Sequence, residues 1–403
     1  MLKTLVHRLL RHRHFWREVE FDELSEIYIT MMFRSLALGL TNLFIPLYML
    51  KLGYSLADVV MVMLFYFVFR GFIFDYLAGW LVTKLGAKHT ILCSYATLIG
   101  STSLFLTLDH MQWPLWLLGG LWGGATSLFA IPFHVDFSKI KHRSHGGKEL
   151  GYVSIMEKLG GILGPIIGGI VATLFGGQYV FLAAMVMLVI GGLPLLRTSE
   201  PFNSHHPLRL HELQFGKIKR DIYSFMAYGV ELTMCGSVWP LYLGLVILTT
   251  SAGYAKLGFL ASVSVIASML AAYTIGKLTD KKHGHHLLRF GAGFNALLYA
   301  FRPFITTYPG ALLINIFNEG ATIAYKIPYT KGMYDRGDEF DRQRVAYFVA
   351  MELTSSLTKA CVWFILLMLT MLYDDLTVTA AGFAFGGLAS LLIMTERFKG
   401  LGR

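Results

Sequence analysis

Residues 124–132 read GATSLFAIP and residues 320–328 read GATIAYKIP, so one motif occurs twice in the chain. The copies lie about 195 positions apart, and further short matches recur at the same offset, which indicates an internal duplication. The further matches are Glu26-Ile27-Tyr28 with Asp221-Ile222-Tyr223, Pro46-Leu47-Tyr48 with Pro240-Leu241-Tyr242, and Tyr152, Met156 and Glu157 with Tyr347, Met351 and Glu352. The sequence therefore predicts two halves of similar structure.

Long apolar stretches fill both halves. Of the 403 residues, 55% are hydrophobic and only 15% are charged, a composition that indicates a membrane protein. The stretches are too long and too continuously apolar for the alternating strands of a membrane barrel. We expect an all-α membrane protein with twelve transmembrane helices in two six-helix, pseudo-symmetric bundles. The expected spans are 27–52, 55–83, 90–108, 114–136, 149–175, 179–196, 222–248, 254–279, 286–306, 310–333, 345–372 and 376–395.

Four segments follow from these spans. Residues 1–20 place Leu and Trp among Arg and His, which is typical of an amphipathic helix on the membrane surface. Residues 21–196 are expected to form the first bundle, 197–220 a soluble linker and 221–403 the second bundle. Two similar bundles are typical of secondary transporters, in which rocking exposes a midplane site to either side in turn.

The distribution of charge predicts the orientation. A formal net charge of +10 would suit nucleic acid, but the basic residues gather in loops on one side of the expected spans. These loops, the linker and both termini are therefore expected in the cytoplasm, with the chain as a multi-pass protein of the cytoplasmic (inner) membrane. The expected partners are a small-molecule substrate, protons and membrane lipids, with no nucleic acid, and we expect a monomer. The basic residues on this side include Lys84, Lys88, Lys217, Arg220, Arg336, Arg344 and Arg397.

The loop after the second expected span reads GWLVTKLGAK over residues 79–88. It resembles the loop motif of the major facilitator superfamily, in which a glycine precedes an acid and several basic residues. The equivalent loop of the second half keeps the acid as Asp280, where the first copy has Thr83. The resemblance implies that Gly79 and Asp280 hold helix ends together in the outward-facing state, since glycine lets helices approach and an acid can meet basic groups.

The fifth expected span carries a second motif. Gly160, Gly164 and Gly168 recur every four residues, and Pro165 removes one backbone hydrogen bond. The pattern resembles the antiporter signature of drug and metabolite exporters in the same superfamily, which implies exchange of substrate for protons. A plain small-residue packing face explains the glycines equally well. Such exporters usually carry an arginine in the fourth span where this chain has Gly119, so the coupling ion stays open.

Ionisable residues inside a membrane cost about 2.5–3.5 kcal/mol each on insertion scales and tend to face cavities or partners. Arg70, Glu319 and Lys359 lie near the middle of their spans, where we expect a functional role, with a purely structural ion pair as the alternative. Arg302 and Asp136 lie close to span ends, and we interpret them as groups that snorkel to the interface. A further intramembrane charge is Asp75.

Polar residues share one face of the expected tenth helix, because Asn315, Glu319, Thr322 and Lys326 stand at i, i+4, i+7 and i+11. We expect this face to line a water-filled space between the halves. Burial raises the pKa of a carboxyl group in general, which allows a glutamate there to load and release a proton. The proton-coupling candidates are Glu319, Glu231, Glu157 and Glu352.

In the superfamily, helices one, four, seven and ten line the cavity, so the resemblance implies that substrate reaches residues on these helices. Four aromatic residues either line a pocket for an amphiphile or serve only in packing. The substrate-binding candidates are Arg34, Arg70, Glu231, Asn315, Glu319 and Lys326. The aromatic residues are Trp122, Phe129, Trp239 and Tyr325.

We therefore expect a secondary active transporter that works by alternating access and exports a small amphiphilic compound in exchange for protons. Two alternatives stay open. One is an importer or exchanger of an organic anion, with Arg34, Arg70 and Lys326 as counter-charges, and the other is a lipid or lysolipid flippase. The sequence contains no P-loop, zinc motif, nucleophile elbow or Rossmann fingerprint, so we expect no enzyme, no cofactor and no metal site.

Overall fold

The computed structural model describes residues 21–42, 45, 48–49, 52–140, 146–175, 178–196, 208–247, 253–279, 283–340, 343–398 and 401. The expected amphipathic segment 1–20, residues 197–207 of the linker and the loop acid Asp280 lie outside these described residues. Within the described residues, every assigned element is a helix.

The helices of the first half follow its six apolar stretches. The second stretch is a composite, in which a short π-helical segment interrupts α-helix without breaking the span. The elements are α2 (Phe21–Thr41), α4 (Leu56–Phe69), η2 (Arg70–Phe74), α5 (Asp75–Leu85), α6 (Ala87–Leu106), α7 (Leu115–Ile140), α8 (Gly146–Leu174), α9 (Gln178–Gly192) and η3 (Pro194–Leu196).

The helices of the second half follow the other six stretches. The seventh span is composite like the second, with π-helical η5 between α10 and α11. The elements are η4 (Leu210–Glu212), α10 (Phe215–Thr233), η5 (Met234–Val238), α11 (Trp239–Val246), α12 (Gly253–Leu278), α13 (Gly284–Phe301), η7 (Arg302–Phe304), α14 (Tyr308–Asp338), α15 (Arg344–Thr370) and α16 (Asp375–Ile393).

Two helices extend beyond the expected spans at the basic side. α10 begins at Phe215, so the last six positions of the expected linker 197–220 are helical. α14 continues to Asp338, past the expected end at 333. Hydropathy misses these turns because they are amphipathic: Ile218 is fully buried while the neighbouring Lys217 is exposed.

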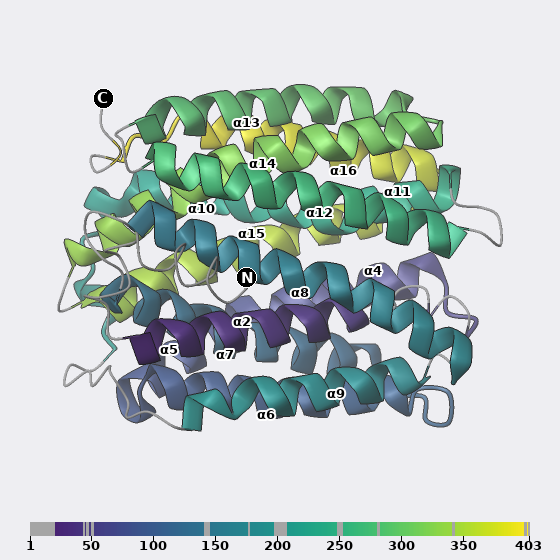
Figure 1. The fold of residues 1–403 in the computed structure, drawn as a ribbon, viewed down its shortest axis with the longest axis horizontal. Helices are drawn as coiled ribbons and strands as arrows, with labels where there is room; N and C mark the ends of the chain where they lie inside the picture. Colours follow the sequence, from purple (N-terminus) through teal and green to yellow (C-terminus); the bar gives the residue numbers. More distant parts are fainter. Residues whose placement is uncertain are drawn as a thin grey trace, which may run out of the picture.

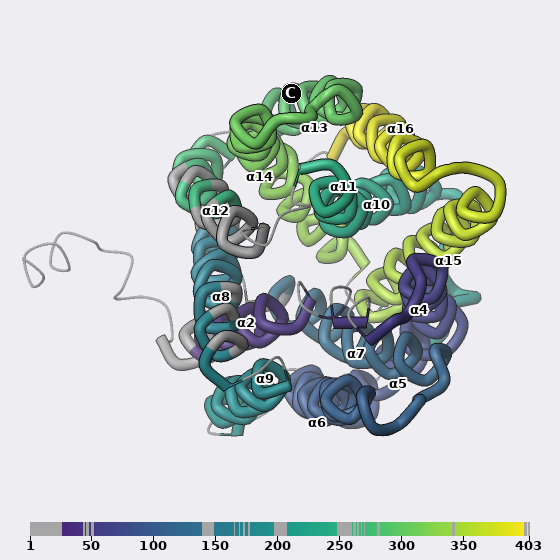
Figure 2. The backbone as a smooth tube through the Cα atoms, turned by 90° about the vertical axis from the view of Figure 1, so that its right-hand side faces the viewer, coloured from purple at the N-terminus to yellow at the C-terminus, as the bar shows by residue number. Residues whose placement is uncertain are grey.

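The helices lie side by side, with the first half in the lower part of Figure 1 and the second half in the upper part. Seen along the helices, α2, α7, α10 and α14 lie nearest the centre, and α6, α9, α13 and α16 lie at the outside (Figure 2). The halves pack on each other along two lines, α4 and α5 against α15 on one side and α8 against α12 on the other.

The surface of these helices suits lipid rather than water. Among the described residues, eight helical spans are long and apolar enough to cross a bilayer. Large apolar side chains such as Phe72, Ile170 and Leu388 are more than half exposed along them. A soluble monomer rarely exposes continuous apolar surface of this kind, so the helices are membrane-spanning.

The repeated motif lies inside α7 and α14, and each helix contains the motif's proline, Pro132 or Pro328, in its interior. π-helical turns are rare and often occur at functional positions. The π-helical turn η2 begins with the intramembrane Arg70. The motif and its proline occupy the fourth and tenth spans, which correspond in the repeat, whereas η2 and η5 lie in the second and seventh spans, which do not.

Glycines allow close helix contacts both between and within the halves. A Cβ atom on Gly79 of α5 would overlap Val349 of α15, so this glycine lets the halves touch. Gly160 and Gly164 of α8 face α2 of the same half, and a Cβ on Gly164 would lie 2.7 Å from the carbonyl carbon of Gly39. These two glycines therefore act in packing within the first half.

The rest of the antiporter-like motif continues the same helix. α8 is helical through Pro165, and Gly168 is buried. The contact of α8 with the second half uses a different face: a Cβ on Gly151 would lie 3.0 Å from the carbonyl oxygen of Ala272 in α12. α8 therefore packs closely on both of its sides, against α2 and against α12.

Candidate functional site

Two ion pairs join the halves through α8 and α14. Lys158 Nζ lies 2.5 Å from Glu319 Oε2, and Lys326 Nζ lies 3.1 Å from Glu157 Oε2. The four side chains are between 21% and 33% exposed, so neither pair is sealed from solvent. We call Glu157, Lys158, Glu319 and Lys326 the charge tetrad.

The positions of the tetrad explain its crossed pairing. Glu157 and Lys158 are neighbours on α8, whereas Glu319 and Lys326 stand seven positions apart on α14, roughly 10 Å along the axis at about 1.5 Å per residue. The two α8 side chains therefore reach in opposite directions along α14. Solvent-exposed ion pairs contribute only about 0–1 kcal/mol each, and these partly exposed pairs are expected to be weaker than fully buried ones. They are weak enough to separate and form again as helices move.

A second group of charges lies between η2, α5, α7 and α15. Arg70 Nη2 lies 2.9 Å from Glu352 Oε2, and Arg70 Nε lies 3.9 Å from Asp75 Oδ1. His134 Nε2 of α7 lies 3.2 Å from the other carboxylate oxygen of Glu352. The ammonium group of Lys359 lies on the same helix as Glu352, two turns further along. We call Arg70, Asp75, His134, Glu352 and Lys359 the buried cluster.

The buried cluster differs from the charge tetrad in accessibility. Arg70, Asp75, Glu352 and Lys359 are each at most 7% exposed. Their formal charges balance, with two cations and two anions, which makes burial of the group tolerable. Removing one partner from a buried pair costs about 3–5 kcal/mol, several times the value of a solvent-exposed pair. The buried cluster can therefore act as a firm connection between the halves, and the tetrad as a labile one.

Arg34 of α2 is a buried cation with an aromatic neighbour. The guanidinium carbon lies 3.8 Å from the centre of the Phe129 ring, and the residue is 6% exposed. Within the described residues, its Nε and Nη2 atoms have no hydrogen-bond partner. An unsatisfied buried cation is costly, so this position favours an anionic or strongly accepting group from a ligand.

Glu231 does not face the space between the halves, contrary to our expectation. It is fully buried inside the second half, where it accepts hydrogen bonds from Asn295 Nδ2 at 2.7 Å and Tyr299 Oη at 3.1 Å, and one from Tyr325. These donors belong to α13 and α14 of the same half. The local network satisfies the carboxylate, so substrate does not reach Glu231 in this conformation.

Arg302 and Asp136 were expected to reach the membrane interface with their charged ends. Both are buried inside the bundles instead, so that expectation is wrong. Arg302 is fully buried, its Nη2 donates to Asn318 Oδ1 at 2.5 Å, and its guanidinium carbon lies 4.1 Å from the centre of the Tyr299 ring. Asp136 is 1% exposed. An amide oxygen and an aromatic ring inside the bundle contact the Arg302 guanidinium, while its Nε and Nη1 atoms have no hydrogen-bond partner within the described residues.

The expected polar face of the tenth helix is divided between two neighbours. Glu319 and Lys326 contact α8 of the first half, whereas Asn315 Oδ1 accepts a hydrogen bond from Trp239 Nε1 at 2.6 Å in its own half. The four aromatic candidates are each at most 6% exposed and are used in packing or hydrogen bonding. These are Trp122, Phe129, Trp239 and Tyr325.

Two residues of the site were missing from the sequence-based candidates. Lys158 provides the partner of Glu319, and His134 joins α7 to both α15 and α14, with Nδ1 2.8 Å from Tyr334 Oη. Lys158 could have been predicted from the sequence, because it is a second charged residue next to Glu157 in the same apolar span. His134 carried no comparable signal.

The chain thus consists of two bundles of membrane-spanning helices with charged side chains at their interface. A family model described as the Major Facilitator Superfamily matches residues 27–325, and the chain belongs to this superfamily. It is therefore a multi-pass membrane protein that transports small molecules and is not an enzyme. The predicted fold, twelve helices in two six-helix bundles, is confirmed.

The curated relatives are resistance proteins of bacteria. MdtG of Proteus mirabilis, a multidrug resistance protein, is 29% identical over 218 residues, which cover 51% of this chain and 50% of that protein. MdtG of Escherichia fergusonii is 27% identical over 313 residues, with 72% and 74% covered. The quinolone resistance protein NorA of Staphylococcus aureus is 24% identical over 224 residues, with 54% and 57% covered. The chain thus spans between half and about three-quarters of the length of these relatives.

Solved structures share the fold. The fucose:proton symporter FucP of E. coli superposes with a TM-score of 0.67 at 14% identity, covering 93% of this chain and 98% of that one. The human organic anion transporter MFSD10 superposes with a TM-score of 0.65 at 9% identity, covering 92% and 98%. At such identities the likeness shows the fold alone.

Proposed function

We propose that the chain exports a small amphiphilic compound in exchange for protons, by alternating access of a site between residues 21–196 and 221–403. The charge tetrad carries this proposal, because its pairs link the halves, are partly exposed and are weak enough to break in each cycle. Curated relatives named for multidrug and quinolone resistance support an amphiphilic substrate and export.

The tetrad supplies the coupling in this proposal. A proton on Glu319 or Glu157 removes the anion from one ion pair and so weakens the contact of α14 with α8. Related exporters carry an arginine at the position of Gly119. No side chain fits at this position, since a Cβ on Gly119 would already overlap the backbone oxygen of Val62. Proton handling therefore falls to the glutamates of the tetrad.

The packing residues have supporting roles. Gly79 allows α5 and α15 to close on the basic side, and Gly160, Gly164 and Gly168 with Pro165 make α8 a closely packed helix that can shift against α2. The charged contacts between the halves and the contact of Gly79 with Val349 lie from the middle of the helices to their basic ends, while α4 also packs on α15 toward the other side. We assign this conformation to the state that is closed on the cytoplasmic side.

Arg34 favours a second candidate function, the transport of an organic anion. Its buried guanidinium has hydrogen-bonding atoms without partners in the described residues, and each tetrad lysine already has a carboxylate. A carboxylate or sulfonate group of a substrate would accept a charge-assisted hydrogen bond from the Arg34 guanidinium. Under this candidate, Arg34→Gln loses substrate binding, whereas under the first it has a smaller effect.

Thermal unfolding of the purified protein distinguishes these substrate classes. A compound that binds only the folded state at 100 times its Kd adds about 2.7 kcal/mol of stability, which raises Tm measurably. We expect hydrophobic drugs to raise Tm, and organic anions, sugars and lysolipids to leave it unchanged. The hits are then tested in proteoliposomes for movement driven by an imposed pH gradient. Stabilisation by organic anions alone, lost in Arg34→Gln, would reject the first candidate for the second.

The orientation is testable with single cysteines. In a background without Cys93, Cys235 and Cys361, we expect His211→Cys to resist a membrane-impermeant maleimide in intact cells and to react after lysis. His211 has a 79% exposed side chain in the segment before α10. The matched variant Met111→Cys lies in the exposed turn between α6 and α7, on the opposite side, and should react in intact cells. The reverse pattern would invert the topology.

A further inference from the structure

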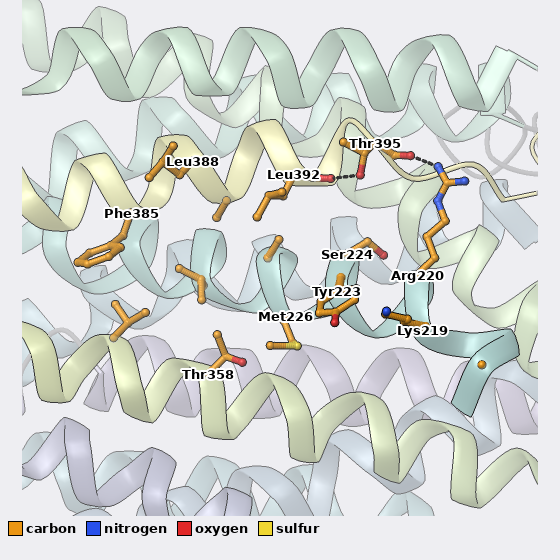
Figure 3. A pocket seen from close by; sticks show the side chains of 15 residues that line it. Lys219, Arg220, Tyr223, Ser224, Met226, Thr358, Phe385, Leu388, Leu392 and Thr395 are labelled. Carbon is orange, nitrogen blue, oxygen red and sulfur yellow. Dashed lines mark hydrogen bonds between the residues drawn. The ribbon is translucent and has the colours of Figure 1, made fainter. Parts of the chain in front are cut away.

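A lateral groove opens between α10, α15 and α16, outside the interface of the two halves. In Figure 3, α10 lies behind the groove as its floor, with α16 on one side and α15 on the other. Its volume is about 670 Å³, within the range of roughly 300–1,000 Å³ that small-ligand sites occupy. The apolar lining includes Met226, Val230, Val362, Phe385, Leu388 and Leu392.

The groove is closed toward the centre of the protein. A Cβ on Gly229 of α10 would overlap Ser355 Oγ and would lie 3.4 Å from Lys359 Nζ, so α10 and α15 touch behind the floor. On the outer side, Tyr223 is 57% exposed and Leu388 is 61% exposed. The groove therefore faces the membrane and does not lead to the charge tetrad.

Cationic groups line the groove at one end only, and the hydroxyl of Thr358, further along the lining, already donates to the carbonyl oxygen of Thr354. Lys219, Arg220, Tyr223 and Ser224 line the end where α10 begins, and the hydroxyl of Thr395 closes it from the side of α16. Arg220 is held by the carbonyl oxygen of Thr395 and by Glu396, whose carboxylate lies 3.4 Å from Nε. Lys219 has no ion-pair partner within the part of the chain that the structure describes. One full positive charge is therefore available there.

The length of the groove matches one leaflet of a bilayer. From Lys219 to Val230 on α10, the lining runs over roughly 16 Å at about 1.5 Å per residue. The hydrocarbon core of a bilayer is about 30 Å thick, so the groove crosses about half of it. Its basic end lies at the level of lipid headgroups and its apolar part at the level of acyl chains.

We propose that this groove binds one anionic phospholipid of the leaflet on the basic side, with the phosphate at Lys219, beside the Arg220–Glu396 pair, and an acyl chain along α10 and α16. Three features of the groove together fit such a lipid: its shape, its apolar lining about one leaflet long and its single charged end. The basic segment 1–20 is a poor occupant, since its arginines would meet the same positive charge. The site lies outside the proposed transport route, so it regulates or stabilises the second half and is not a substrate site.

Native mass spectrometry of the full chain in detergent tests this site by titration with phosphatidylglycerol and phosphatidylcholine of identical acyl chains. We expect phosphatidylglycerol to bind at least about fivefold more tightly, the value expected for one basic side chain near an anionic headgroup. Lys219→Gln should abolish this preference. The matched variant Lys217→Gln removes an exposed charge two residues away that does not line the groove, and it should keep the preference.

Two further measurements test whether the lipid binds in the groove and whether the site recognises the whole lipid or only its phosphate. Gly216 lines the basic end, and no atom lies within 4 Å of a Cβ built there, so a side chain can leave the backbone without a clash and Gly216→Trp should weaken both lipids by obstructing the groove. Millimolar inorganic phosphate should not displace phosphatidylglycerol. Equal binding of the two lipids, an equal loss in Lys217→Gln, or displacement by phosphate would each overturn the proposal. None of these outcomes depends on transport, so the proposed function stands or falls separately.

Discussion

Proton-driven transport is expected to disappear, and substrate exchange to persist, when Glu319 is replaced by glutamine. Glu319 Oε2 lies 2.5 Å from Lys158 Nζ across the two halves, so its charge holds α14 to α8 in this conformation. Glutamine has nearly the same shape as a protonated glutamate but cannot release a proton. The variant should therefore complete the substrate half of the cycle without moving a proton. Proteoliposomes with an imposed pH gradient measure the first activity, and counterflow without a gradient measures the second.

Lys158 complicates this experiment, because Glu319→Gln leaves its ammonium group without a carboxylate. A second variant, Glu319→Gln with Lys158→Gln, removes both charges and should show the same loss of coupling with better counterflow. Glu157→Gln makes the same chemical change in the other tetrad pair and serves as the comparison. If Glu319→Gln retains full gradient-driven transport while Glu157→Gln loses it, the coupling role belongs to Glu157. If both retain it, the tetrad does not couple protons.

The fold could be predicted from the sequence because its determinants are local or repeated. A helix that crosses a bilayer requires about twenty consecutive, mostly apolar residues, and such a stretch can be recognised locally in the sequence. The repeated motif of α7 and α14 shows that the halves are alike without any knowledge of contacts. Errors occurred where a helix leaves the membrane, as at Phe215, because amphipathic turns lower the hydropathy without ending the helix.

The site was predictable only as a set of charges, since the pairing depends on contacts between distant segments. Lys158 and Glu319 are separated by 161 positions, and nothing local indicates that they meet. For Glu231, an expected exposure is absent. A charge in a cavity-lining helix was expected to face the cavity, but Asn295, Tyr299 and Tyr325 donate hydrogen bonds to its carboxylate inside the bundle. Helix periodicity predicts which face a residue occupies, and only packing determines which neighbour that face meets.

The difference in burial between the two charge groups gives them different places in the transport cycle. The tetrad pairs are partly exposed, so a proton on one carboxylate can release them. The Arg70–Glu352 pair costs about 3–5 kcal/mol when one partner is removed. A contact of that size, made between the halves, sets the balance between the two states if it is present in only one of them.

Glu352→Gln is therefore expected to shift the chain out of the conformation that is closed on the basic side. Glu352 contacts both Arg70 and His134, so the variant weakens two inter-half contacts at once. A loss of about 3 kcal/mol corresponds to a change of about 10²-fold in the ratio of the two states. Spin labels on Lys84→Cys and Glu339→Cys, exposed positions at the basic ends of α5 and α14, report the separation of the halves by pulsed electron resonance. A second, longer distance should appear or become dominant.

Two comparisons decide whether this shift reflects the ion pair itself. Glu212→Gln makes the same chemical change in an exposed pair within one segment, with Arg209, and should leave the distances unchanged. Arg70→Met combined with Glu352→Leu removes one cation and one anion, so the buried cluster stays neutral, with Lys359 as the remaining counter-charge of Asp75. The double variant should therefore restore part of the short-distance population that Glu352→Gln alone loses. If Glu352→Gln leaves the short distance intact, the buried cluster does not hold the halves together, and closure at the basic side rests on helix packing such as that of Gly79 against Val349.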